Sequence, residues 1–321
     1  MSIQGYSEGQ QGISEVVVTE EPSLRERIKE FMRAEAEEGE LRERTSFYCT
    51  DNEKNQFDLY HAWLRTPYTN PMTPESKVSL GTRKLVELSI VSIFRKMGIL
   101  VEGKDKEEQR SLYRIEMIRN GVKVTGYKDA IIKEGLLNIP VEIKTSDGYY
   151  ALKELEAGTP KSNYLKQLAQ YIDYDEAPYG YLFQMHFEAP FRIKDMYQFK
   201  VEVIKQGDGS KVFRCNEVEF DIWEVYKRWA NIYNTYIEPK IEPPSEFRYK
   251  FPIEEIDWTK LSTKQISDAR NNHSVIGNWE VKYSSYKDLI IEREGTELGY
   301  TDAELKRINE ITKGYTSKKK E

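Results

Sequence analysis

The spacing of apolar residues along the chain changes from a helical period to a strand period. Between residues 79 and 97 apolar side chains recur every three to four positions and Gly98 follows, which predicts a helix over Ser79–Met97. Short runs rich in β-branched and aromatic residues come next and predict strands. They span Ile99–Glu102, Tyr113–Arg119, Val122–Ile132 and Ile139–Thr145. Asn120-Gly121, between two of these runs, predicts a tight hairpin.

Helical spacing and strand spacing alternate again between residues 162 and 237. Helical spacing predicts helices at Ser162–Asp173 and at about Phe220–Ile237, the second rich in aromatic residues. The strands expected between them are Tyr179–Phe187, Met196–Ile204 and Val212–Glu217, with a hairpin at Gly207-Asp208-Gly209. An order of helix, strand meander, helix and strand predicts an α/β fold with a mixed central sheet flanked by helices.

The two ends of the chain differ in pattern from this middle region. Ser23–Arg44 is dense in Glu and Arg, and Ser23 with Glu26 fits a capping box, so we predict a helix with a solvated charged face. Prolines mark a loop near 65–78 and a break after residue 238. We therefore predict that the chain has three parts. Residues 1–78 form a helical and flexible N-terminal extension, residues 79–240 form the core, and residues 241–321 form a charged, mainly helical C-terminal extension.

Composition narrows the class of protein. The 321 residues are 39% hydrophobic and carry a formal net charge of −6, whereas a protein that coats DNA by charge alone would be basic. An acidic metal nuclease with one basic groove remains compatible with this charge. Cys49 and Cys215 stand in no paired motif, which excludes a four-cysteine iron–sulfur or zinc site and suits a reducing cytoplasm, that of the host cell if the protein is viral. Charged residues interrupt the apolar stretch Leu85–Leu100, so we expect no membrane span.

The candidate chemistry lies in the segment GYKDAIIKEGLLNIPVEIKT. Glu142 and Lys144 are two apart on one predicted strand, so they share a face, while Ile143 points the other way. Asp129 lies on the preceding predicted strand. Carboxylates so placed can hold Mg²⁺ or Mn²⁺, which would polarise a phosphodiester and acidify a bound water. Lys144 could orient that water or stabilise negative charge, although the spacing alone also fits a surface ion pair.

Two helical positions add to this group. Glu87 falls between Phe94 and Val91 on a largely apolar arc of its helix, where a lone carboxylate is costly unless it is paired or binds a metal. A salt bridge to Arg83 is the alternative. On the later helix Gln167 and Tyr171 are four apart and lie on one face, with Tyr164 one turn earlier. They could hold a phosphate or a metal-bound water, or form an exposed polar face.

The motifs GTRKLVEL, GYKDAI, VEIKT and QLAQY, in this order, resemble the RecB-like branch of the PD-(D/E)XK nucleases over about residues 79–240. That branch includes phage recombination exonucleases and CRISPR-associated RecB-like nucleases. The resemblance implies a restriction-endonuclease-like core, Mg²⁺ or Mn²⁺ and cleavage of DNA, usually from an end. It implies six catalytic residues, namely Glu87, Asp129, Glu142, Lys144, Gln167 and Tyr171. The implied metal ligands are Glu87, Asp129, Glu142 and the backbone carbonyl of Ile143.

The chain departs from that family at several points. Many members carry a histidine on the first helix where this chain has Lys84 or Leu85, and this favours a site of the phage-exonuclease type. The cluster-binding cysteines of several members are missing. The sequence also lacks a G-x-x-x-x-G-K-[ST] loop, so it is not a fused helicase–nuclease.

The resulting expectation is a metal-dependent exonuclease that acts on linear DNA or free DNA ends in phage or mobile-element recombination or repair. A structure- or sequence-specific endonuclease of the same fold and a non-catalytic nucleic-acid-binding or assembly protein are the alternatives. A recombination or annealing partner and a homo-oligomer both stay open. DNA contacts are expected from Lys128, Lys161 and Lys166 to phosphates and from Tyr164 by stacking.

Overall fold

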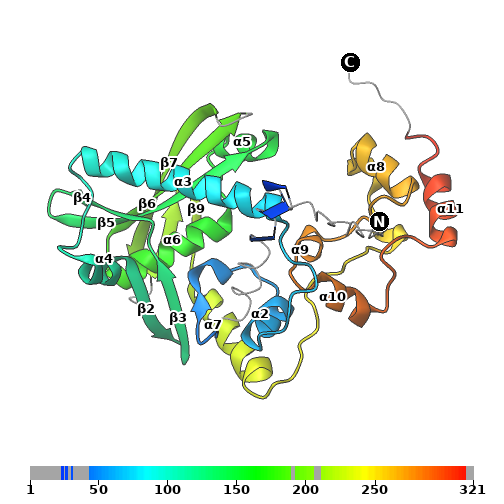
Figure 1. The fold of residues 1–321 in the computed structure, drawn as a ribbon, viewed down its shortest axis with the longest axis horizontal. Coiled ribbons are helices and arrows are strands. Elements are labelled where there is room, and N and C mark those ends of the chain that lie inside the picture. Colours follow the sequence, from blue (N-terminus) through cyan, green and yellow to red (C-terminus); the bar gives the residue numbers. More distant parts are fainter. Residues whose placement is uncertain are drawn as a thin grey trace, which may run out of the picture.

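The computed structural model describes residues 43–188, 192–205 and 211–315, together with 23, 24, 26, 27, 30 and 31. Within this part the protein is an α/β fold of two mixed sheets flanked by helices (Figure 1). The smaller sheet has the order β1-β3-β2, with β1 Phe47–Tyr48, β2 Arg114–Arg119 and β3 Val122–Tyr127. The larger has the order β4-β5-β6-β7-β8-β9, with β4 Ala130–Glu134, β5 Leu137–Asp147, β6 Tyr179–Glu188, β7 Arg192–Lys205, β8 Lys211–Cys215 and β9 Val218–Phe220.

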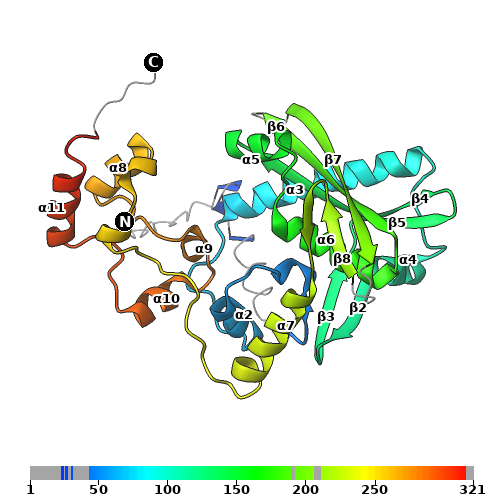
Figure 2. The same cartoon turned by 180° about the vertical axis from the view of Figure 1, so that it is seen from behind.

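The helices occupy both sides of the sheets and the C-terminal region. Those of the core are α2 Gln56–Trp63, α3 Pro74–Lys96, α4 Lys106–Tyr113, α5 Tyr149–Glu156, α6 Ser162–Asp175 and α7 Trp223–Ile232, the last continued by a π-helical turn over Tyr233–Ile237. The C-terminal helices are α8 Thr263–Arg270, α9 Trp279–Lys282, α10 Lys287–Glu294 and α11 Asp302–Ile311. They lie to one side of the sheets in both views (Figures 1 and 2). No helix in the described ranges is long and apolar enough to cross a bilayer.

The predicted strand Val122–Ile132 is wrong as a single element. The chain leaves the smaller sheet after Tyr127 and enters the larger one at Ala130. Between them the Lys128 amide still donates to the Tyr113 carbonyl, next to β2, whereas the Asp129 carboxylate accepts the Ile143 amide of β5. Gly126, Lys128 and Asp129 interrupt the apolar pattern at this point and were the available signal of the break. The expected strand at Ile99–Glu102 is likewise only an isolated bridge, between Leu100 and Ile132.

Other local predictions are confirmed or fall outside the described ranges. Asn120 and Gly121 both have positive φ, 48° and 82°, as the predicted hairpin turn between β2 and β3 requires. The predicted hairpin at Gly207-Asp208-Gly209 and most of the predicted helix Ser23–Arg44 lie outside the described residues. The helices α2, α4 and α5 were not predicted.

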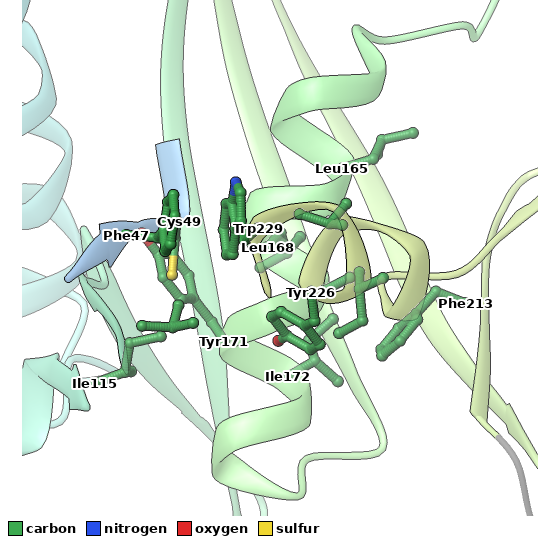
Figure 3. Packing of buried hydrophobic residues seen from close by; sticks show 14 of the residues in the cluster. Phe47, Cys49, Ile115, Leu165, Leu168, Tyr171, Ile172, Phe213, Tyr226 and Trp229 are labelled. Carbon is green, nitrogen blue, oxygen red and sulfur yellow. The ribbon is translucent and has the colours of Figure 1, made fainter. Parts of the chain in front are cut away.

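Alternation along β5 divides the larger sheet into two differently covered faces. Ile139, Val141 and Ile143 pack with Ile90 of α3 in one apolar cluster. On the opposite face of the sheet a second cluster joins β6–β8 to α6 and α7 and includes Leu168, Ile172, Leu182, Val201 and Trp229 (Figure 3). Because neighbouring residues of a strand point to opposite faces, Glu142 and Lys144 lie on the α6 side.

Packing crosses the predicted boundary at residue 78. Phe47, Leu59 and Tyr60 belong to the same buried cluster as α6 and α7, and β1 pairs with β3. The segment from residue 43 onward is therefore part of the core rather than an appendage to it. In the C-terminal region Trp258, Ile266 and other residues form an apolar cluster of their own.

Candidate active site

The chain passes from the smaller to the larger sheet at Asp129, and charged side chains from three elements meet there. One Asp129 oxygen, Oδ2, accepts the Ile143 amide of β5 at 2.9 Å. On β5 the Lys144 ammonium donates to Glu142 Oε1. From α3, the Lys84 ammonium lies 2.8 Å from Glu87 Oε2 and 3.8 Å from Asp129 Oδ1. The four charged residues singled out in the sequence are thus brought to one place.

Glu142 is the most constrained of these groups. Its side chain is 0% exposed, and its Oε2 atom has no hydrogen-bond partner among the described residues. Burial, and then the charge of Asp129, raise the pKa of Glu142 to about 8. A buried carboxylate with an unused oxygen is costly unless a cation or a proton compensates it. Such a strongly shifted group beside other acids is typical of a functional site.

The two lysines respond to the same negative charge. Burial alone would lower the pKa of Lys144, but the charges of Glu142 and Asp129 outweigh burial and raise it. Partial burial likewise tends to lower the pKa of Lys84, but its hydrogen bond to Glu87 and the charge of Asp129 leave it raised. Both side chains are therefore ammonium groups at neutral pH. Lys144 also lies 5.4 Å from the centre of the Tyr164 ring, within range of a cation–π contact.

The acids offer the type of oxygen ligand that a hard divalent cation prefers, but the Lys84 ammonium lies between Glu87 and Asp129. No group of three or more His, Cys, Asp or Glu in the described ranges is spaced to hold a metal as it stands. The Lys84 side chain is 61% exposed and could swing away from Glu87 and Asp129. The carboxylates and the unpartnered Glu142 Oε2 are the oxygen ligands that Mg²⁺ and Mn²⁺ prefer.

The alternative of a Glu87–Arg83 ion pair is wrong. Arg83 pairs with Asp147 at 2.8 Å, while Glu87 pairs with Lys84. Glu87 is 17% exposed, consistent with its predicted position on the inward arc of the helix. Lys84 was predicted only to replace the family's histidine, and its ionic contacts were not foreseen. An i, i+3 spacing from Glu87 was the available signal.

Gln167 and Tyr171 are buried, at 5% and 1% exposure, so the alternative of an exposed polar face is wrong. Gln167 Nε2 donates to the Tyr171 hydroxyl at 2.8 Å, and that hydroxyl donates to the Tyr127 carbonyl at 2.9 Å. Tyr127 ends β3 two residues before Asp129. The pair therefore fixes the strand end from which Asp129 extends.

The Tyr171 hydroxyl can reach the Tyr127 carbonyl because the backbone at Gly126 passes close to the Tyr171 ring. A Cβ atom on Gly126 would lie 2.8 Å from Cys49 Sγ and 3.1 Å from a ring carbon of Tyr171. Figure 3 shows the Tyr171 side chain reaching from α6 toward Cys49. Burial, followed by the charge of Glu142, raises the pKa of Tyr171 well above its usual value, so its hydroxyl stays protonated and able to donate.

Tyr171→Phe is expected to lower the free energy of unfolding by about 1 kcal/mol, because the partly buried hydrogen bond to the Tyr127 carbonyl is lost. If the site is catalytic, the loosened Asp129 should also lower kcat/KM roughly ten- to a hundredfold. Denaturant unfolding and steady-state cleavage measure the two effects. Tyr283→Phe, on a 73% exposed side chain in the C-terminal region, is the matched control. If Tyr171→Phe keeps the wild-type free energy of unfolding and the wild-type kcat/KM, the Tyr171–Tyr127 hydrogen bond does not hold Asp129 in place.

The predicted DNA contacts divide into two groups. Lys161 is exposed at the start of α6, Lys166 is 25% exposed and pairs with Glu53 at 3.1 Å, and Tyr164 is half-buried beside Lys144. Lys128 does not fit the prediction. It is 5% exposed, and its ammonium lies 2.6 and 2.8 Å from the two carboxylate oxygens of Asp175. It is a buried structural ion pair that cannot reach a phosphate.

No protein-family model matches the sequence, and no curated protein matches it either. Among solved structures, one described as "Crystal structure of SSO0001" is similar at 19% sequence identity, over 65% of this chain and 87% of that chain, with a TM-score of 0.36. A similarity at this level carries no argument about the function of this chain.

Proposed function

We propose that this protein is a metal-dependent DNA nuclease with a restriction-endonuclease-like core of the PD-(D/E)XK type, and that it acts as an exonuclease. The observation that carries the proposal is the state of Glu142. It is fully buried with one unpartnered oxygen, and it lies beside Asp129, Glu87 and an ammonium group on its own strand. Most buried side-chain polar atoms have a hydrogen-bond partner, so the unused Glu142 oxygen beside two other acids supports a cation site here.

Each side chain has a distinct part in this proposal. Glu87, Asp129, Glu142 and the Ile143 carbonyl would hold Mg²⁺ or Mn²⁺, which when bound supplies Lewis acidity and an acidified water. Lys144 would orient the attacking water and stabilise charge on the phosphate. Gln167 and Tyr171 hold the strand end that carries Asp129. Tyr164 lies against Lys144, where it could stack on a terminal base.

Incubation with linear and covalently closed circular DNA, in Mg²⁺, Mn²⁺ or EDTA, tests the proposal. We expect mononucleotides or short products from linear DNA only, in either metal, and none in EDTA or from Lys144→Met. Cleavage of the circle would indicate an endonuclease instead. No cleavage of any DNA under all conditions would favour a non-catalytic binding protein and overturn the proposal.

The exposed cations at the start of α6 are expected to draw DNA toward the site. Lys161→Glu should weaken DNA binding and reduce the slope of log affinity against log salt by about one for each lost phosphate contact. Lys166→Glu should have a smaller effect, because Glu53 already neutralises part of its charge. Binding titrations across a salt series measure both, with Lys264→Glu on α8 as the control. Unchanged affinity and slope in Lys161→Glu would remove this surface from the proposal.

A further inference from the structure

A buried glutamine on β6 lies directly beside Lys144. Strands β5 and β6 are parallel, and their register pairs Lys144 with Gln184. Paired residues of adjacent strands point to the same face of a sheet. Gln184 therefore shares the α6-covered face with Glu142 and Lys144, although it is not among the site residues predicted from the sequence. The alternation of Leu182, Gln184 and His186 along β6 was the signal available in the sequence.

The Gln184 amide oxygen is unsatisfied. The residue is 2% exposed, and Oε1 has no hydrogen-bond partner within the described ranges. A buried amide acceptor without a donor is destabilising. The register places an ammonium group with three N–H donors at the neighbouring position. In this structure that ammonium donates to Glu142 instead.

Lys144 and a metal ion would compete for the same carboxylate. Glu142 Oε1 accepts from the Lys144 ammonium, and a divalent cation bound to Glu142 would repel that ammonium. The ammonium then needs another acceptor in a poorly solvated place, since the Lys144 side chain is only 20% exposed. Gln184 Oε1 is an unused acceptor at the paired position.

We infer that Gln184 is a positioning residue whose amide oxygen accepts the Lys144 ammonium when Glu142 binds a metal ion. This inference rests on the proposed metal-dependent function. Gln184 relieves the competition for Glu142, and it holds Lys144 near the site where the ammonium would orient water. The glutamine itself touches neither the metal nor the DNA.

A double-mutant cycle on metal affinity tests this role without using catalysis. Calorimetry would measure Mn²⁺ binding to wild type, Gln184→Met, Lys144→Met and the double variant. Gln184→Met should raise the Mn²⁺ dissociation constant about tenfold, as for the loss of a hydrogen bond to a charged group. In the Lys144→Met background the same change should have no effect, because no ammonium remains to be held.

Two further variants separate this role from a structural one. Gln184→Met should melt at or above the wild-type temperature, because it removes an unsatisfied buried polar group. Gln184→Glu retains an acceptor and should keep Mn²⁺ affinity close to wild type, and Gln184→Leu replaces Gln184→Met if that variant fails to fold. Gln198→Met, on β7 but on the opposite face and exposed, is the matched control.

The outcomes distinguish this inference from the function on which it rests. If the wild type binds Mn²⁺ and Gln184→Met binds it with the same affinity, the role of Gln184 is overturned and the metal site still stands. An equal loss of affinity with and without Lys144 would also overturn it, and would point to the neighbouring Tyr197 of β7 as the partner of Gln184. Absence of saturable Mn²⁺ binding to the wild type would overturn both proposals.

Discussion

Lys144→Met is expected to lower kcat for cleavage of linear duplex DNA by about a thousandfold, the effect of losing both water orientation and charge stabilisation. The fold should survive, because methionine fills nearly the same volume along the Tyr164 ring. Mn²⁺ binding should also survive and could strengthen, since Lys144 no longer competes for Glu142. Loss of cleavage with retained metal binding is the signature that separates Lys144 from the metal ligands.

Single-turnover cleavage and Mn²⁺ calorimetry on the same preparations measure these two effects. Lys264→Met, on an exposed lysine of α8, controls for removal of a positive charge elsewhere. A loss of cleavage smaller than about tenfold would mean that Lys144 contributes no more than an ordinary hydrogen bond. In that case another group would have to activate the water.

Glu142→Gln is expected to abolish metal binding and to remove most of the pH dependence of stability near neutrality. The pKa of Glu142 is raised from 4.5 to about 8 in the folded protein. Between these two values the folded state holds a proton that the unfolded chain releases. The stability that this proton contributes is therefore complete below pH 4.5 and is lost as the pH rises through 8. At about 1.4 kcal/mol for each unit of pKa difference, the loss amounts to a few kcal/mol.

Mn²⁺ should reverse this trend, because it binds the deprotonated carboxylate. Without metal the wild type should melt at progressively lower temperature from about pH 5 to pH 9, and added Mn²⁺ should raise Tm most at the alkaline end. Glu142→Gln should show a flatter pH profile and no Mn²⁺ effect. Thermal unfolding across this pH range measures both. A wild-type Tm that rises toward pH 9 without metal would contradict the buried, protonated state of Glu142.

The sequence predicted the parts of the site that depend on local geometry. Residues two apart on a strand share a face whatever surrounds them, so the placement of Glu142 with Lys144 followed from spacing alone. The joint helical face of Gln167 and Tyr171 followed in the same way. Their burial did not, because it depends on α6 packing against β3 and on the absence of a side chain at Gly126.

Features that depend on contacts between distant segments escaped the sequence. Lys128 looked like an exposed cation in a charged segment, but it is buried against Asp175 at the end of α6, which only the tertiary fold brings near. The division of Val122–Ile132 between two sheets was missed for a similar reason, since it depends on which strands pair with β3 and with β4. The contribution of Phe47 and Leu59 to the core likewise depends on pairing between β1 and β3.

The proposed function requires that the carboxylates around Glu142 bind a divalent metal ion. Anomalous diffraction at the manganese edge, from crystals grown with saturating Mn²⁺, tests this claim most directly. We expect a peak bounded by the side chains of Asp129 and Glu142, with the Lys84 ammonium moved away from Asp129. A peak bound only elsewhere on the protein, or none at all with Lys84 still seated on Asp129, would contradict it.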